Sequence, residues 1–379
     1  MLINHPTMPG AGGIRHYFLN AVMKTGNSQF FIHLPMNGSG VFKYFQSVNN
    51  RGEYMTSLSL QGCDDISKKS YSMQELGEIF IDGLPEHIAM LKIPGRWIAG
   101  DVRRSPVPAH IDHVKDIQNM MYEVLCHEIT QEAQAYAEGT FLAFLQKDEV
   151  DPGVLSFFNG WNETHKTTSL VSGKIIMRLS ADALYISHED QAIYHNVLAH
   201  MHEVTKDDFG LGQKGHDGMY KYMTNAFRAA AWVDDQYKIN ECNEFSDFLY
   251  NTGIAKHKSA MRSPEYLQSV MDAMMVSVAS ELWNGREYNF LAQFIEGKLL
   301  SFNASLNEDT KTLRNAKGYV MGHAGEVENR HGLHALAALQ AFGRIAGLSF
   351  DTERLKHVML DYNRRVGVAF SALQNVLTH

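Results

Sequence analysis

Cysteine is scarce in this chain, and its scarcity excludes two kinds of protein. Only Cys63, Cys126 and Cys242 occur in 379 residues, too few and too scattered for a disulfide framework or a cysteine-based zinc site. A reducing compartment is the simplest interpretation. No run of about eighteen apolar residues appears, and the N-terminal MLINHPTMPGAGG lacks the basic and apolar segments of a signal peptide. We therefore expect a cytoplasmic protein without a membrane partner.

Positive charge is also in short supply. Asp and Glu number 42 against 34 Lys and Arg, which gives a net charge of -8. This balance argues against a nucleic acid or an anionic membrane held by bulk electrostatics. The hydrophobic share of 45% provides for a sizeable core. Histidine and methionine are abundant at 19 each, but histidine is both a common metal ligand and a routine polar residue, so its abundance alone decides nothing.

The first 111 residues form an N-terminal extension or small domain of mixed character. SQFFIHLPMNGSG predicts a short strand that ends in a turn, and YSMQELGEIFIDGLPEHIAML predicts a helix that begins at a serine cap. KIPGRWIAGDVRRSPVPAHI has the proline and glycine density of a loop. A lid, a dimerisation element of a homodimer and a partner-docking domain all fit this part.

Residues 112–379 carry a helical pattern almost throughout. Apolar residues recur at three- and four-residue spacing in HVKDIQNMMYEVLCHEITQEAQAYAEGTFLAFLQ, which predicts one long helix or two. Later helices begin at capping motifs, which are Asp-Pro, Ser-Pro-Glu and Asp-Thr-Glu. The last two motifs also place an acid in the first turn of the helix. Strand-like alternation is rare, so we predict an all-α bundle of about seven or eight helices.

GHAGEVENRHGLHAL holds the densest group of candidate ligands. On one continuous helix His323, His331 and His334 fall within roughly 80° of one another, and Glu328 lies about 60° beyond His331. A carboxylate and an imidazole three residues apart can bind one metal, as Glu-x-x-His pairs do inside helical bundles. The same spacing also suits a solvated helix face with a simple side-chain pair.

Two other segments offer ligands. HEVTKDDFGLGQKGHDGMYKYM places acids at a helix end, then a glycine turn, then His216 ahead of an apolar helix. Glu281 follows a long apolar stretch, where a buried carboxylate needs a partner, although an exposed helix end would also explain it. HNVLAHMH, with His195, His200 and His202, suits a polar face or a surface metal site.

The order of these segments resembles the haem-oxygenase-like helical superfamily, which includes thiaminase II, pyrroloquinoline quinone synthase and non-haem di-iron oxidases. EVENRHGLHAL is similar to the penultimate core helix of that family, and DDFGLG with the following His216 resembles its glycine turn. FLAFLQKDEVDPGVLSFFNGWNETHKTTSLV, LQSVMDAMMVSVASEL and LKHVMLDYNRRVGVAFSALQNVL resemble its opening, its acid-bearing helix and its last helix. The resemblance covers about residues 135–378.

The resemblance implies a set of metal ligands. Carried over by position, the ligands of di-iron members fall on Glu163, Asp208, His216, Glu281, Glu328 and His331. Asp208 stands where the family usually has glutamate, with Asp207 and Glu203 as rivals. Di-iron members place a further histidine four residues before the helix acid, whereas His323 lies five before Glu328. If His323 is a ligand, we predict a π-type irregularity near Gly325 that compensates for the offset.

Three functions follow as alternatives. The first is a non-haem iron oxidase or oxygenase with two iron ions, or manganese, that uses O2 on a small amino-acid-like or fatty substrate. The second is a metal-free enzyme of the thiaminase II or pyrroloquinoline quinone synthase type. The third is a non-catalytic binding protein on the same scaffold. A haem-binding protein with His127 or His165 as the haem ligand is a weaker variant of this third function, because the sequence contains no clear haem-binding motif.

Overall fold

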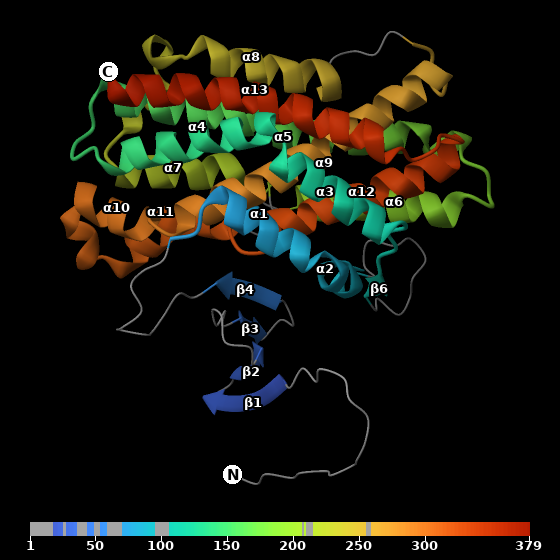
Figure 1. Cartoon of the computed structure of the whole chain (residues 1–379), viewed down its shortest axis with the longest axis horizontal. Coiled ribbons are helices and arrows are strands. Elements are labelled where there is room, and N and C mark those ends of the chain that lie inside the picture. The colour runs from blue at the N-terminus through green and yellow to red at the C-terminus, as the bar shows by residue number, and fades with distance from the viewer. Residues whose placement is uncertain are drawn as a thin grey trace. The chain divides into compact units, whose positions relative to one another are not determined.

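The chain divides into two compact units, Met1–Ser67 and Lys68–His379. The computed structural model describes residues 18–25, 28–35, 44–48 and 54–58 as strands, and it describes residues 70–94, 106–206, 208–209, 215–254 and 259–379 (Figure 1). Residues 68–111, which lie before the boundary expected near residue 112, belong to the second unit.

The first unit contains an antiparallel sheet with the strand order β1-β2-β3-β4. Thr25 pairs with Ser28 at one end of the first hairpin, and Phe18 pairs with Pro35 at the other. The strand predicted in SQFFIHLP is confirmed as β2. The four strands are β1 (Phe18–Thr25), β2 (Ser28–Pro35), β3 (Tyr44–Val48) and β4 (Tyr54–Leu58).

In its described residues the second unit is all-α apart from one small two-stranded sheet, which confirms the predicted class (Figure 1). The sheet pairs β5 (Lys92–Ile93) with β6 (Val107–Pro108). The helices of the described residues are α1 (Met73–Asp82), α2 (Leu84–Met90), α3 (Val114–Cys126), α4 (Glu128–Leu145), α5 (Pro152–Asp182), α6 (Gln191–Thr205), α7 (His216–Ala226), α8 (Asn240–Leu249), α9 (Pro264–Ala292), α10 (Ile295–Phe302), α11 (Thr310–His323), α12 (Val327–Ala346) and α13 (Thr352–Thr378).

The helix starts read from the sequence are confirmed. The Ser72 side chain accepts a hydrogen bond from Glu75 N, and the Glu75 carboxylate accepts one from Ser72 N, which completes a capping box for α1. Asp151 accepts from the amide of Val154 at 2.7 Å ahead of α5. Ser263 and Asp351 cap α9 and α13 in the same way. Each cap satisfies an amide that the helix itself leaves without an acceptor.

The described residues form more helices than the seven or eight expected. The segment after residue 112, expected as one long helix or two, forms two: α3 stops at Cys126, and His127 caps α4 by accepting a hydrogen bond from Ile129 N. The segment expected from Ser263 onward is divided into α9 and α10, and α8 was not expected. The segment around GHAGEVENRHGLHAL is divided into α11 and α12.

Helix α9 lies at the centre of the bundle. It contacts α12, α13, α5, α11 and α1, and every residue from Val270 to Leu291 except Asp272 and Asn289 is buried. A helix that is covered on all sides must bury any polar residue it carries. Glu281, Asn284, Arg286 and Glu287 therefore need partners inside the protein, and Glu281 and Asn284 line the candidate site.

None of the described helices is both long enough and apolar enough to cross a bilayer.

Candidate metal centre

Six of the seven predicted ligands lie in two buried triads. Within each triad every residue offers one ligand atom, and these atoms lie within 4.8 Å of one another. The first triad consists of Asp208, His216 and His323, and the second consists of Glu281, Glu328 and His331.

A short connection brings Asp208 and His216 together. Helix α6 ends at Thr205 and α7 begins at His216. The backbone amide of His216 donates to the carbonyl of Asp208 at 3.0 Å, which fixes the two ends of the connection against each other. Asp208 is half-buried, whereas His216 is buried. Asp208 is therefore placed by the turn between α6 and α7; its rival Asp207 lies outside the described residues, and Glu203 lies in α6, where Lys206 pairs with it at 2.7 Å.

Glu281 comes from the middle of α9 and not from an exposed helix end. Only 2% of its surface is accessible, and α9 continues to Ala292. Glu281 Oε2 lies 3.7 Å from His331 Nδ1. The acid that follows the long apolar stretch is thus directed into the bundle, where it requires a hydrogen-bonding or metal partner.

The predicted π-type irregularity near Gly325 is wrong, and so is the continuous helix it would repair. Helix α11 ends at His323, Ala324 has extended backbone, and Gly325 has φ 75°, before α12 begins at Val327. Glycine adopts this left-handed conformation without the penalty that a Cβ would bring. The break turns the chain, so the angular relation of a regular helix no longer applies between His323 and Glu328.

Asn289 on α9 holds this break in place. Its side-chain amide donates to the carbonyl of Gly325 at 2.8 Å, and its side-chain oxygen accepts from the amide of Gly325 at 2.7 Å. The same amide group donates to Gly285 O. Gly325 lies between α11 and α12, where neither helix bonds its backbone amide or carbonyl. Asn289 satisfies both of these groups.

Glu328 links the two triads. Its Oε1 lies 2.5 Å from His323 Nδ1, and its Oε2 lies 3.4 Å from His331 Nδ1. One oxygen thus faces a histidine of the first triad and the other faces a histidine of the second. A carboxylate in this position can serve two neighbouring cations at once.

Burial and mutual proximity shift the protonation of the cluster. Burial raises the pKa of Glu281 well above its ordinary value, and the neighbouring Glu328 adds to the effect. Burial also opposes ionisation of Glu328, but the contacts with His323 and His331 outweigh it and hold the pKa of Glu328 well below the ordinary value. Burial raises the pKa of Asp208 and lowers the pKa of His216. A bound cation would favour the charged carboxylates and neutral imidazoles that ligation requires.

Several ligand atoms of the cluster lack hydrogen-bond partners. His216 Nδ1, His323 Nε2 and Glu281 Oε1 are buried and have none among the described residues. The carboxylate of Asp217 is 4.0 Å from His216 Nδ1, too far for a hydrogen bond. Each such atom costs about 1–3 kcal/mol when it stays unsatisfied. Imidazole nitrogen and carboxylate oxygen together suit iron and manganese, so the residues present fit a metal centre.

A tyrosine pair supports the first triad. Tyr319 on α11 forms a hydrogen bond with His216 Nε2 at 3.1 Å, and its hydroxyl lies 2.8 Å from that of Tyr288 on α9. The Tyr288 ring stacks on His323 with ring centroids 4.9 Å apart. Contacts of this kind fix the orientation of a ligand imidazole. Neither tyrosine was expected from the sequence, because each becomes a neighbour of the histidines only through packing.

Glu163 does not join either triad. It lies on α5, where it forms an ion pair with Lys166. An α-helix turns by about 200° over two residues, and the cavity beside the triads is lined by His165, Thr168 and Ser169 of α5 but not by Glu163. The acid and the histidine therefore point to different sides of α5, and the inward position belongs to His165.

His165 is bound to a buried carboxylate. Its Nε2 lies 3.1 Å from Glu287 Oε1, and its Nδ1 lies 2.9 Å from Trp161 O. Glu287 also accepts hydrogen bonds from the indoles of Trp161 and Trp283, at 2.6 and 2.7 Å. Burial lowers the pKa of His165, but the contact with Glu287 outweighs it, so the net shift is upward. With both ring nitrogens bonded to acceptors, His165 is not placed as a haem ligand.

The cavity between these residues is small and polar. It contains about 10 Å³ of space, which is about what one water molecule needs. Aromatic and methionine residues at helical spacing can line an apolar cavity but are more often core, and here they are core: Phe157, Phe158, Trp161, Tyr220, Met274, Met275 and Trp283 are at most 1% exposed. The cavity is lined by the first triad, by Glu281 and Glu328, and by His165, Thr168, Ser169, Asn284 and Tyr288.

The remaining histidines have structural contacts. His200 Nδ1 lies 2.8 Å from His334 Nδ1, and both residues are buried between α6 and α12. The surface metal site considered for HNVLAHMH is not formed, because His200 faces inward while His195 is only half-buried. His127 caps α4.

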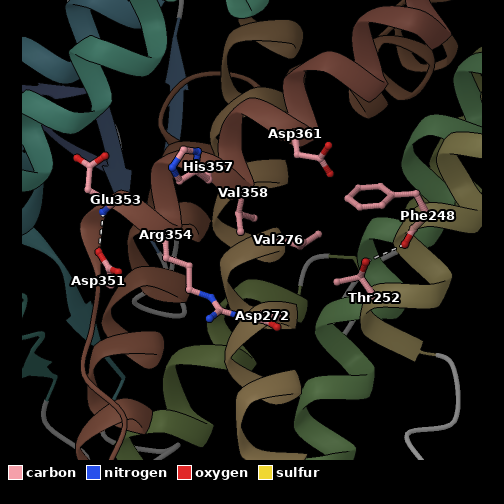
Figure 2. A pocket seen from close by; sticks show the side chains of 10 residues that line it. All are labelled: Phe248, Thr252, Asp272, Val276, Asp351, Glu353, Arg354, His357, Val358 and Asp361. Carbon is pink, nitrogen blue, oxygen red and sulfur yellow. Dashed lines mark hydrogen bonds and ion pairs between the residues drawn. The ribbon is translucent and has the colours of Figure 1, made fainter. Parts of the chain in front are cut away.

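A larger hollow of about 660 Å³ lies elsewhere on the second unit, between α8, α9 and α13 (Figure 2). Asp272 on α9 and Arg354 on α13 form an ion pair of 2.6 Å within it, and Phe248, Val276 and Val358 supply apolar surface. None of its lining residues belongs to the triads.

Comparisons with protein-family models, curated proteins and solved structures found no match to this chain.

Proposed function

We propose that this protein is a non-haem di-iron oxidase or oxygenase with a haem-oxygenase-like helical fold. The observation that carries the proposal is the pair of adjoining triads, with Glu328 reaching a histidine of each. Three carboxylates and three imidazoles on the helices of one bundle are a ligand set that suits two iron or manganese ions. The proposal also rests on the resemblance found in the sequence over about residues 135–378.

In this proposal Asp208, His216 and His323 hold one ion, and Glu281, Glu328 and His331 hold the other. When bound, two iron ions would supply the electrons that O2 reduction needs. Tyr319 orients the His216 ring through Nε2, which leaves Nδ1 directed at the metal. Asn289 holds the turn between α11 and α12 so that His323 and Glu328 face each other.

The cavity has room for about one water molecule, so it would have to widen to admit a substrate. Its polar lining favours a small amino-acid-like substrate over a fatty one. Thr168 Oγ1 is buried and has no hydrogen-bond partner among the described residues, and Ser169 and Asn284 line the same space. An alkyl chain placed there would leave these groups unsatisfied, whereas a polar substrate would bond to them.

A metal-free enzyme with a cysteine nucleophile is the less supported alternative. Cys242 is fully buried, and burial raises the pKa of its thiol far above the range in which a thiolate forms. Cys126 is exposed at the end of α3. Neither lines the cavity, and Cys63 lies outside the described residues.

Metal quantitation tests the proposal. Protein purified without chelators should contain about two irons per chain, and the Glu328→Ala and His331→Ala variants should lose them while they keep their helical circular dichroism. Glu326→Ala is the matched control, because Glu326 is only half-buried and lies outside both triads. Protein that remains metal-free after anaerobic addition of Fe(II) would refute the proposal and favour the metal-free enzyme or a binding protein.

A further inference from the structure

Arg286 on α9 is a buried cation that faces α1 and α13. Only 7% of its surface is exposed. Its side chain passes over Gly77 of α1, where a Cβ would come 2.7 Å from Leu125 Cδ1 and 3.2 Å from Arg286 Cδ. The bare glycine therefore makes room for Leu125 and for the arginine stem.

The guanidinium of Arg286 has no acidic partner among the described residues. Its Nε donates to Leu282 O, one turn earlier on the same helix, at 3.3 Å. Its Cζ lies 5.2 Å from the centroid of the Trp283 ring. No carboxylate lies within ion-pair distance in the described part of the chain. Of the five N–H groups of a guanidinium, the four on the terminal nitrogens have no described acceptor, and these nitrogens are not fully closed off from solvent.

This arrangement is unfavourable unless something completes it. Buried charges in proteins are normally paired, because removing an unpaired charge from water is costly. Burial lowers the pKa of Arg286 to about 10, and the only neighbour that opposes this shift is Tyr362 on α13. Contact with the Trp283 ring compensates only in part. An apolar side chain of similar length would pack here without the penalty.

We propose that Arg286 is a binding site for an oxyanion, a carboxylate or phosphate group, between α1, α9 and α13. A planar guanidinium presents paired N–H groups that match two oxygens of such an anion. Tyr362 lies near enough to affect the charge of Arg286, and burial raises the pKa of Tyr362 well above its ordinary value, so its hydroxyl remains a donor.

The site is separate from the candidate metal centre. Arg286 follows Glu281 by five residues, which places the two side chains about 140° apart around α9. The proposal therefore does not rest on the metal centre, and either can fail without the other.

Thermal unfolding of the whole chain in sodium chloride, sodium acetate and sodium phosphate at equal ionic strength tests the site. The chloride series measures general screening. In phosphate or acetate the Tm of the wild type should rise further, by about 2 to 5 °C when the anion reaches 100 times its Kd. The anion that raises the Tm more, phosphate or acetate, shows whether the site prefers a phosphate or a carboxylate group.

Three variants decide the assignment. Arg286→Met should abolish the extra rise and should unfold in chloride at the wild-type Tm or above it, because an unpaired buried charge is removed. Arg286→Lys should retain a smaller rise. Arg344→Met, which removes an exposed arginine paired with Asp112, should retain the full rise. An equal rise in Arg286→Met and the wild type, or a lower Tm of Arg286→Met in chloride, would overturn the proposal.

Discussion

Glu328 Oε1 lies 2.5 Å from His323 Nδ1 although the two residues belong to different helices. The contact exists because the chain turns at Gly325 between α11 and α12. On one continuous helix, residues five apart would point about 140° away from each other. The break therefore brings the two side chains together, as a spacing of three or four residues does within a continuous helix.

Asn289→Ala should weaken metal binding at the first triad more than at the second. The variant removes both hydrogen bonds to Gly325 and frees the turn that directs His323 toward Glu328. Loss of such a supporting contact typically lowers metal affinity about 10- to 100-fold. Iron titration followed by absorbance measures the two sites. Gln293→Ala, at the residue that follows the same helix and is bonded to Tyr71, is the control, and equal affinities in both variants would contradict the role of Asn289.

Tyr319→Phe should lower the affinity of the first triad for Fe(II) by about 10-fold or more. The variant deletes the hydroxyl that bonds to His216 Nε2 and leaves the ring in place. Tyr288→Phe is the matched comparison, since it removes the other hydroxyl of the pair without touching His216. We expect calorimetric titration to separate the two variants. Identical isotherms would mean that Tyr319 does not orient the histidine.

Acidification should destabilise the protein through His200 and His334. Burial lowers the pKa of His200 to about 4 and lowers the pKa of His334 well below its ordinary value, whereas unfolded histidine titrates near pH 6.5. The unfolded state thus binds more protons between these values, so stability is complete above about pH 6.5 and falls as the pH decreases toward 4. The contribution of His200 approaches about 3 kcal/mol at the acid end.

Urea unfolding from pH 7 to pH 4 measures this effect. His200→Gln should flatten the decline in unfolding free energy, and His195→Gln, a half-buried histidine on the same helix, should leave the decline intact. An unchanged decline in His200→Gln would show that other groups cause it.

Glu287→Gln should destabilise the bundle by about 3–5 kcal/mol. The carboxylate accepts from Trp161 and Trp283 and pairs with His165 in a fully buried site. An amide offers only one acceptor oxygen, and its NH2 group would face a donor. Denaturant unfolding measures the change, with Glu296→Gln as the control. Glu296 forms an exposed pair with Lys317, so its loss should cost at most about 1 kcal/mol.

The sequence by itself determined the helical class and many of the helix starts. Ser72, Asp151 and Ser263 identify their helices because a cap acts over only three or four residues. The candidate ligand residues could also be predicted from the sequence, because carboxylates and histidines are unusual next to glycine turns and within apolar stretches. His216, Glu328 and His331 were named on that basis together with the family resemblance.

Tertiary structure alone decided which of these side chains meet. Whether Glu163 or His165 faces the cavity depends on the rotation of α5 against its neighbours, which no local pattern fixes. Glu281 is buried because other helices cover α9 on every side, and His323 reaches Glu328 because Asn289, thirty-six residues earlier than Gly325, holds the turn between α11 and α12. Such contacts join residues far apart in the chain, and their energies depend on packing that a local sequence does not encode.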